Sequence, residues 1–93
     1  MKPATNTPAD KGQPDLSGWV VQVGSFSRKS NALSLQDRLR KKGYAAYVEA
    51  YQAKNGTRYR VRVGPELSEE KSKASASSLK REMGIDGFVL HQK

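Results

Sequence analysis

Basic and apolar residues alternate through the stretch RYRVRVGP, residues 58–65, and this two-residue period is typical of a half-buried β-strand. The apolar side chains would point toward a core, and the basic side chains would form a row on the opposite face: Arg58, Arg60 and Arg62. Three adjacent guanidinium groups would need partners inside a core. We therefore expect the row to face water or an anionic ligand; the simpler interpretation is that it is only the solvated side of a sheet.

Similar patterns predict the other elements. Residues 19–24 alternate as a strand in which Gln22, a polar residue with no packing reason to be there, shares a face with Val20 and Gly24. Asn55-Gly56 is a strong hairpin signal, so the strands on either side of it should pair antiparallel. In chain order we expect a strand over 19–24, a helix over 28–42, a strand over 44–51, the arginine strand ending at 64–65, a helix from 68 to about 83 and a strand over 87–91.

Cap residues mark the ends of both predicted helices. Ser27 or Ser30 would cap the first helix, and Ser68 would cap the second. Gly43 and Gly84 follow the two helices, where a residue of left-handed conformation is common.

The order strand-helix-strand-strand-helix-strand predicts an α+β, ferredoxin-like (RNP-like) fold with a four-stranded antiparallel sheet and both helices on one face. The other face of the sheet would then be open. The register of the last strand cannot be assigned from its pattern. On the open face we expect Gln22, Tyr47, Tyr51, Arg58, Arg60 and Arg62.

Length and charge indicate one small basic domain. The chain has 93 residues and a net charge of +8. Residues 1–17, with three prolines and few apolar side chains, are predicted to be a flexible linker, and residues 18–93 the domain. The excess of basic residues lies entirely in the domain, which indicates an anionic partner such as nucleic acid, a membrane surface or an acidic polysaccharide.

The side chains favour binding over catalysis. The chain has no cysteine and a single histidine, His91, and its one pair of acids, Glu69-Glu70, is explained as charge in the first turn of a helix. No metal-ligand spacing or phosphate-loop pattern is recognisable, so we expect neither enzymatic activity nor a cofactor or metal. Arginine recognises carboxylate or phosphate, tyrosine rings stack on flat apolar surfaces, and glutamine serves amides and hydroxyls. Two ligands fit this set: single-stranded nucleic acid and an acidic glycan.

Several motifs in order carry a family resemblance. The stretch WVVQVGSFS, residues 19–27, resembles the opening of SPOR domains, and the similarity continues through Ala32, Leu39 and Gly43 to the stretch RVRVGP, residues 60–65. It covers nearly all of the predicted domain. The resemblance implies the same β-α-β-β-α-β fold and a module of a bacterial envelope protein.

The resemblance also implies a ligand. SPOR domains bind peptidoglycan, specifically glycan strands stripped of stem peptides, and so gather at the division septum. Carried over to this sequence, the family's binding residues fall on Gln22, Ser25, Arg58 and Arg60, although some relatives have an aromatic residue at the position of Arg58. We add Arg62, Tyr47 and Tyr51 from their expected place on the open face.

The resemblance implies a cellular setting too. We expect a monomeric domain of a longer, membrane-anchored or exported protein, on the periplasmic side of the cell envelope at the septum. Whether a cell-wall hydrolase domain accompanies it is open. The alternative function is a single-stranded nucleic-acid-binding module of the same topology, although the third strand lacks the basic-Gly-aromatic-x-aromatic run of such modules.

Overall fold

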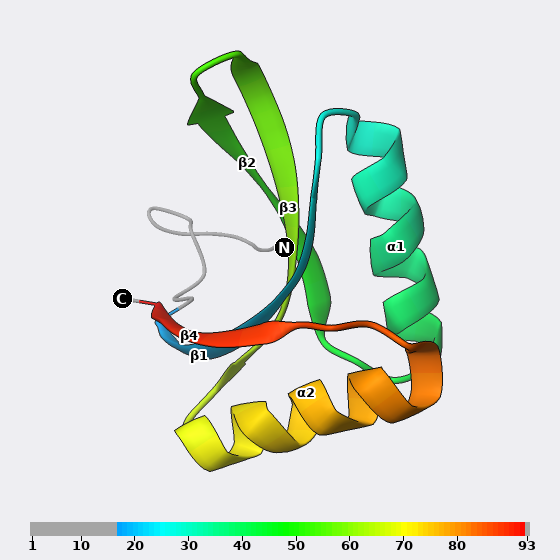
Figure 1. Ribbon diagram of the computed structural model, residues 1–93, viewed down its shortest axis with the longest axis vertical. Coiled ribbons are helices and arrows are strands. Elements are labelled where there is room, and N and C mark those ends of the chain that lie inside the picture. The colour runs from blue at the N-terminus through cyan, green and yellow to red at the C-terminus, as the bar shows by residue number, and fades with distance from the viewer. Residues whose placement is uncertain (1–16, 93) are drawn as a thin grey trace, which may run out of the picture.

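The computed structural model describes residues 17–92, so the predicted linker over 1–17 lies outside the described residues except for Ser17. Four strands and two helices follow one another in the predicted order (Figure 1). They are β1 (Gly18–Phe26), α1 (Lys29–Lys41), β2 (Ala46–Ala53), β3 (Gly56–Glu66), α2 (Glu69–Met83) and β4 (Phe88–Gln92).

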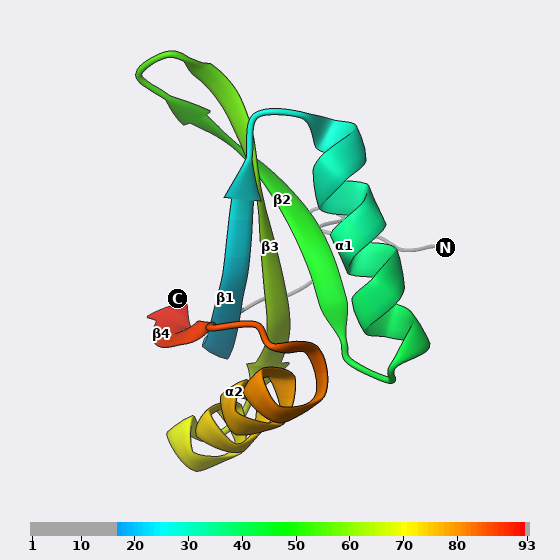
Figure 2. The ribbon, with the colours of Figure 1, turned by 45° about the vertical axis from the view of Figure 1, so that its right-hand side comes forward.

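The strands form one antiparallel sheet in the order β2-β3-β1-β4, and the two helices pack on the same face of it (Figures 1 and 2). The α+β, ferredoxin-like fold is therefore confirmed. The core lies between sheet and helices and joins Leu35 and Leu39 of α1, Leu79 of α2 and Val21 and Val61 of the sheet. Burial of these side chains fixes which face of each strand remains open to solvent.

The helix ends agree with the sequence prediction in part. Ser68 caps α2, since its Oγ accepts a hydrogen bond from the Lys71 backbone N–H at 3.2 Å, and Gly84 follows in the left-handed conformation. The cap predicted for α1 is wrong. Arg28 occupies the N-cap position without a side-chain hydrogen bond, so Ser27 lies before that position and Ser30 lies inside the first turn.

The β2–β3 hairpin sets the register of the arginine strand. Ala53 pairs with Gly56, so the loop consists of Lys54 and Asn55, and Gly56 has a φ of 122°, which favours glycine. β2 begins two residues later than expected, because the Tyr44 N–H still bonds the Leu39 carbonyl at the end of α1. The resulting cross-strand pairs on the open face are Tyr47 with Arg62, Glu49 with Arg60 and Tyr51 with Arg58.

Two register shifts interrupt the pairing of β1 with β3. One lies between Trp19 and Val21 and lets β3 continue to Glu66, past its predicted end. The other lies between Gln22 and Gly24 and leaves Val23 as an extra residue. Such a bulge reverses the facing of every residue after it.

The second bulge corrects the predicted facing of Gly24. Strict alternation placed Gly24 on the open face with Gln22, but it pairs with Val61 on the helix-facing side. A Cβ there would lie 3.1 Å from the Phe26 ring, a distance at which the ring would have to shift. Ser25 correspondingly pairs with Arg60 and joins the open face.

Candidate functional site: the open face of the sheet

The open face is defined by residues of β1, β2 and β3 that point away from the helices. All seven residues that the sequence predicted for the site lie there, together with one acid. They are Gln22, Ser25, Tyr47, Glu49, Tyr51, Arg58, Arg60 and Arg62.

Arg62 is buried, with 7% of its surface exposed. Its Nε and Nη2 both donate to Gln22 Oε1 at 3.1 Å, and its Nη1 donates to Gln92 Oε1 and, at 3.4 Å, to Glu49 Oε1. The expectation that the whole arginine row faces water or a ligand is wrong at this position. The partners that a buried guanidinium needs come from three other strands.

Tyr47 belongs to the same group, because its hydroxyl donates to Gln92 Oε1 at 3.2 Å. Burial raises the pKa of Tyr47 above its usual value. Gln22, Tyr47, Arg62 and Gln92 thus form one hydrogen-bonded group, here called the Arg62 cluster. The Gln22 side-chain nitrogen donates to no other described residue, so this end of the amide remains available.

Arg60 lies further along the strand and is more accessible. Its Nε donates to Glu49 Oε1 at 2.7 Å, and its guanidinium carbon lies 4.4 Å from the centre of the Tyr51 ring. The side chain keeps 28% of its surface exposed, and its two terminal nitrogens bond no residue within 17–92. A fixed guanidinium with free terminal N–H groups can bind a carboxylate in a bidentate manner.

Ser25, Tyr51 and Arg58 complete the second group, here called the Arg60 cluster with Arg60 included. The hydroxyls of Ser25 and Tyr51 lie 2.8 Å apart, and Arg58 Nε donates to Ser25 Oγ at 3.4 Å. The hydrogen bond from Ser25, assisted by the hydrogen bond and charge of Arg58, lowers the pKa of Tyr51 below its usual value. The Tyr51 ring is covered by Arg60 on one side, so it serves the arginine as a cation–π partner.

Three residues at this face were not predicted as site residues. Glu49 joins the two clusters through ion pairs to Arg60 and Arg62, and its place two residues after Tyr47 on β2 could have indicated this. Gln92 and Phe88 come from β4, whose register could not be assigned from sequence. Phe88 pairs with Gln22 in the sheet and has 58% of its surface exposed.

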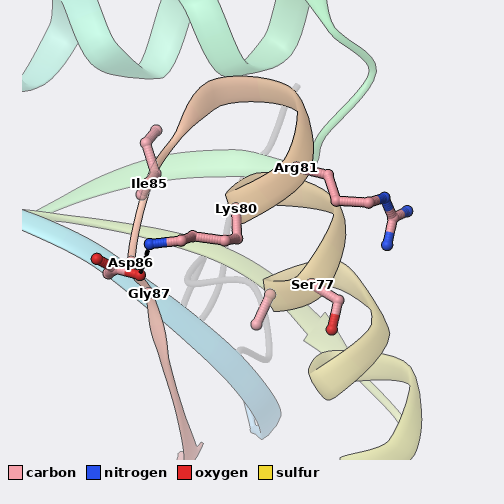
Figure 3. Close-up of a pocket in the computed structure, with 7 residues that line it drawn as sticks. Ser77, Lys80, Arg81, Ile85, Asp86 and Gly87 are labelled. Atoms are coloured by element: carbon pink, nitrogen blue, oxygen red, sulfur yellow. Dashed lines mark hydrogen bonds and ion pairs between the residues drawn. The ribbon is translucent and has the colours of Figure 1, made fainter.

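A concavity of the described residues lies away from this face. A hollow of about 480 Å³ separates α2 from the segment before β4 (Figure 3). The Lys80 ammonium lies 2.7 Å from Asp86 Oδ1 across it, so this cation of the hollow is already paired. We place the candidate site on the open face, where several donors remain available.

Residues 17–92 contain no group of three or more His, Cys, Asp or Glu side chains that could hold a metal ion. His91 instead packs against Trp19, with ring centres 4.8 Å apart. No helix within the same residues has the length and apolar character needed to cross a membrane.

A family model of the SPOR domain matches residues 15–91. The chain belongs to the SPOR domain family. The recognition made from the motifs is therefore confirmed, and the matched region includes every residue of the open face.

Relatives extend this result. The cell division protein DedD of Escherichia coli K12 is 31% identical over 81 residues, which are 87% of this chain and 37% of DedD. The chain thus spans little more than a third of that relative. The peptidoglycan binding domain of the Bacillus subtilis cell wall lytic enzyme CwlC has a TM-score of 0.67 and 30% identity, over 87% of this chain and 98% of that domain.

The SPOR domain of RlpA from Pseudomonas aeruginosa shares the fold, with a TM-score of 0.71 at 20% identity, over 81% of this chain and all of that one.

Proposed function

We propose that this SPOR domain is a non-catalytic module that binds peptidoglycan through the open face of its sheet. The observation that carries the proposal is the placement of Gln22, Ser25, Arg58 and Arg60 side by side, with donor groups that no described residue occupies. The solved CwlC domain, similar in sequence and fold, is described as peptidoglycan binding, which supports the same ligand class here.

The preferred ligand is a glycan strand stripped of its stem peptides. Such a strand has a free lactyl carboxylate on each muramic acid, and the terminal nitrogens of Arg60 offer a bidentate partner for it. A stem peptide converts this carboxylate to an amide and adds bulk. Selectivity then combines a lost ionic attraction with a steric clash.

The two clusters contribute to glycan binding in different ways. The Arg60 cluster supplies the accessible guanidinium groups of Arg58 and Arg60 and the Ser25 hydroxyl. Within the Arg62 cluster, Arg62 is a positioning residue, because its bonds hold Gln22 with the amide nitrogen available for an acetamido or hydroxyl group. The exposed ring of Phe88 beside Gln22 offers an apolar surface for a sugar face.

The tyrosines favour glycan over single-stranded nucleic acid, the alternative function. Binding of bases needs accessible aromatic rings on which successive bases stack. Tyr51 lies beneath Arg60, and Tyr47 is half-buried and hydrogen-bonded to Gln92. Both tyrosines of β2 are therefore already engaged by neighbouring side chains, beside the arginine row of β3.

The cellular role follows from the ligand. Stripped strands would bring the domain, and the protein that contains it, to the division septum on the periplasmic side of the cell envelope. The similarity to the cell division protein DedD supports this setting. The rest of the proposal is that the domain is monomeric and that its parent protein is exported or membrane-anchored.

A sedimentation assay with purified sacculi tests the proposal. We expect the domain to bind amidase-treated sacculi better than untreated ones, and Arg60→Ala to lose most of this binding. Arg81→Ala, which removes one exposed positive charge from α2, is the matched control and should bind as the unaltered domain does. Equal or better binding to untreated sacculi would refute the preference for stripped strands, and no binding to either would refute the function.

A further inference from the structure

Glu49 is the acid among the residues that define the open face, and it lies between its arginines. A single oxygen, Oε1, accepts from Arg60 Nε at 2.7 Å and from Arg62 Nη1 at 3.4 Å. The Glu49 side chain remains 35% exposed, so the carboxylate lies at the surface on which a ligand would approach.

The first consequence of this contact concerns geometry. Arg60 is held on two sides, by Glu49 at Nε and by the Tyr51 ring against its guanidinium plane. Only the edge formed by its two terminal nitrogens remains without a partner among the described residues. A guanidinium fixed in this way loses less conformational freedom when it binds a carboxylate than an unrestrained one would.

The second consequence concerns charge. Glu49 cancels one of the three positive charges in the row of Arg58, Arg60 and Arg62. For a densely charged polymer such as nucleic acid, the binding free energy grows with the number of phosphates that the protein's cations neutralise. A ligand with discrete, spaced carboxylates depends more on the geometry of each contact. The same carboxylate therefore weakens binding of the first kind of ligand while organising the arginine for the second.

We propose that Glu49 is a specificity-determining residue, which positions Arg60 for a discrete carboxylate and lowers the affinity of the open face for polyphosphates. The positioning part rests on the proposed function of this face. The charge part applies to any polyanion, so it can be tested without the glycan.

Two substitutions separate the two parts. Glu49→Gln removes the charge but keeps an oxygen that can accept from Arg60, whereas Glu49→Ala removes both. Glu70→Gln, an exposed acid in the first turn of α2 with no ion pair among the described residues, is the control for an equal change in net charge. Thermal melting establishes that each variant is folded before titration.

The variants are titrated with an oligothymidylate and with purified bare glycan at several salt concentrations. We expect Glu49→Gln and Glu49→Ala to bind the oligonucleotide about fivefold tighter at low salt, as removal of one charge beside the contact implies. The salt dependence should steepen by about 0.7 in slope, one further phosphate contact. Glu70→Gln should change both quantities little. On bare glycan, Glu49→Ala should bind several-fold more weakly than Glu49→Gln.

Two results would overturn the proposal. If Glu70→Gln raised oligonucleotide affinity as much as Glu49→Gln, the effect would be one of net charge alone. If Glu49→Ala and Glu49→Gln bound glycan equally, the acceptor oxygen at position 49 would have no positioning role. Absence of glycan binding by the unaltered domain would refute the proposed function and the positioning part with it, while the oligonucleotide comparison would still decide the charge part.

Discussion

The open face and helix α1 are both basic, but they hold their charges in different ways. The open face has three arginines and one acid, a net charge of +2, and all of its arginines are hydrogen-bonded to neighbouring side chains. Residues 28–42, which comprise α1 and its flanks, have six basic residues and Asp37, a net charge of +5. None of them forms an ion pair with another residue in 17–92; only Arg40 is tied to the fold, through its Nε and the Ala46 carbonyl.

This difference indicates that the number of positive charges in a region does not by itself determine which anion the region recognises. Exposed cations such as those of α1 attract any anion, and salt screens the attraction. Guanidinium groups with fixed planes present their free N–H groups in one geometry, which a matching carboxylate can use. The proposed function accordingly places ligand selectivity on the open face, the less charged of the two regions.

The largest effect is expected at Arg62. Arg62→Ala leaves Gln22 Oε1 without the donor that it has among the described residues, and it removes a donor from Gln92 Oε1 and one cation from Glu49, so it should destabilise the domain by about 3 kcal/mol. For a domain of this size that corresponds to a fall in Tm of about 12 °C or more. Urea and thermal unfolding measure both values. A loss below about 0.5 kcal/mol would show that the cluster does not stabilise the fold.

Arg60 should affect binding more than folding, since its side chain is partly exposed. Arg60→Ala should weaken binding of bare glycan about tenfold or more, because a charge-assisted hydrogen bond contributes about 1.5–3 kcal/mol. Arg60→Lys keeps the charge without the planar fork and should restore only part of the affinity. Full affinity of Arg60→Lys in titrations with purified glycan would mean that charge alone suffices.

Gln22 tests whether the Arg62 cluster serves binding as well as stability. Gln22→Glu keeps the oxygen that accepts from Arg62 and strengthens that contact, so thermal stability should stay equal or rise. The added negative charge should repel a ligand carboxylate, and the lost amide nitrogen removes a donor. Glycan affinity should therefore fall several-fold. Unchanged affinity would exclude Gln22 from the site.

The smallest effect on glycan binding is expected from α1. The double change Lys41→Gln and Lys42→Gln removes two positive charges from the end of α1, a helix that packs on the face of the sheet opposite the arginine row (Figure 1). Affinity for bare glycan should change less than about twofold at physiological salt, where the Debye length is about 8 Å. Oligonucleotide binding at low salt should weaken clearly. A loss of glycan affinity as large as that of Arg60→Ala would indicate that glycan binds to the basic surface in general and not to one site.

The fold could be predicted because each element carries its own periodic pattern and end signals. The alternation of residues 58–65, the Asn55-Gly56 turn and the Ser68 and Gly84 caps each agree with the structure in the kind of element they predict. Their agreement with one topology, in order, is what made the fold class predictable.

The sequence placed seven residues on the open face, but it did not show how they contact one another, and it left out Glu49, Phe88 and Gln92. Alternation alone would have put Ser25 on the wrong face, because the bulge at Val23 depends on how β1 pairs with β3. The buried Arg62 donates to Gln92, and this contact could not be predicted because the register of β4 was not assigned from the sequence. Gln22 consequently has a structural role, as the acceptor for Arg62, that its sequence context did not indicate.

Chemical-shift mapping of the isotope-labelled domain tests the central claim most directly. On titration with purified bare glycan, we expect the largest shifts at the Arg60 Nε–H, the Gln22 side-chain amide and the backbone of β1 and β3. The amides of α1 should stay unchanged although that region has the greater charge. Chemical-shift changes concentrated on α1, without changes on the open face, would contradict the proposal that the open face binds the glycan.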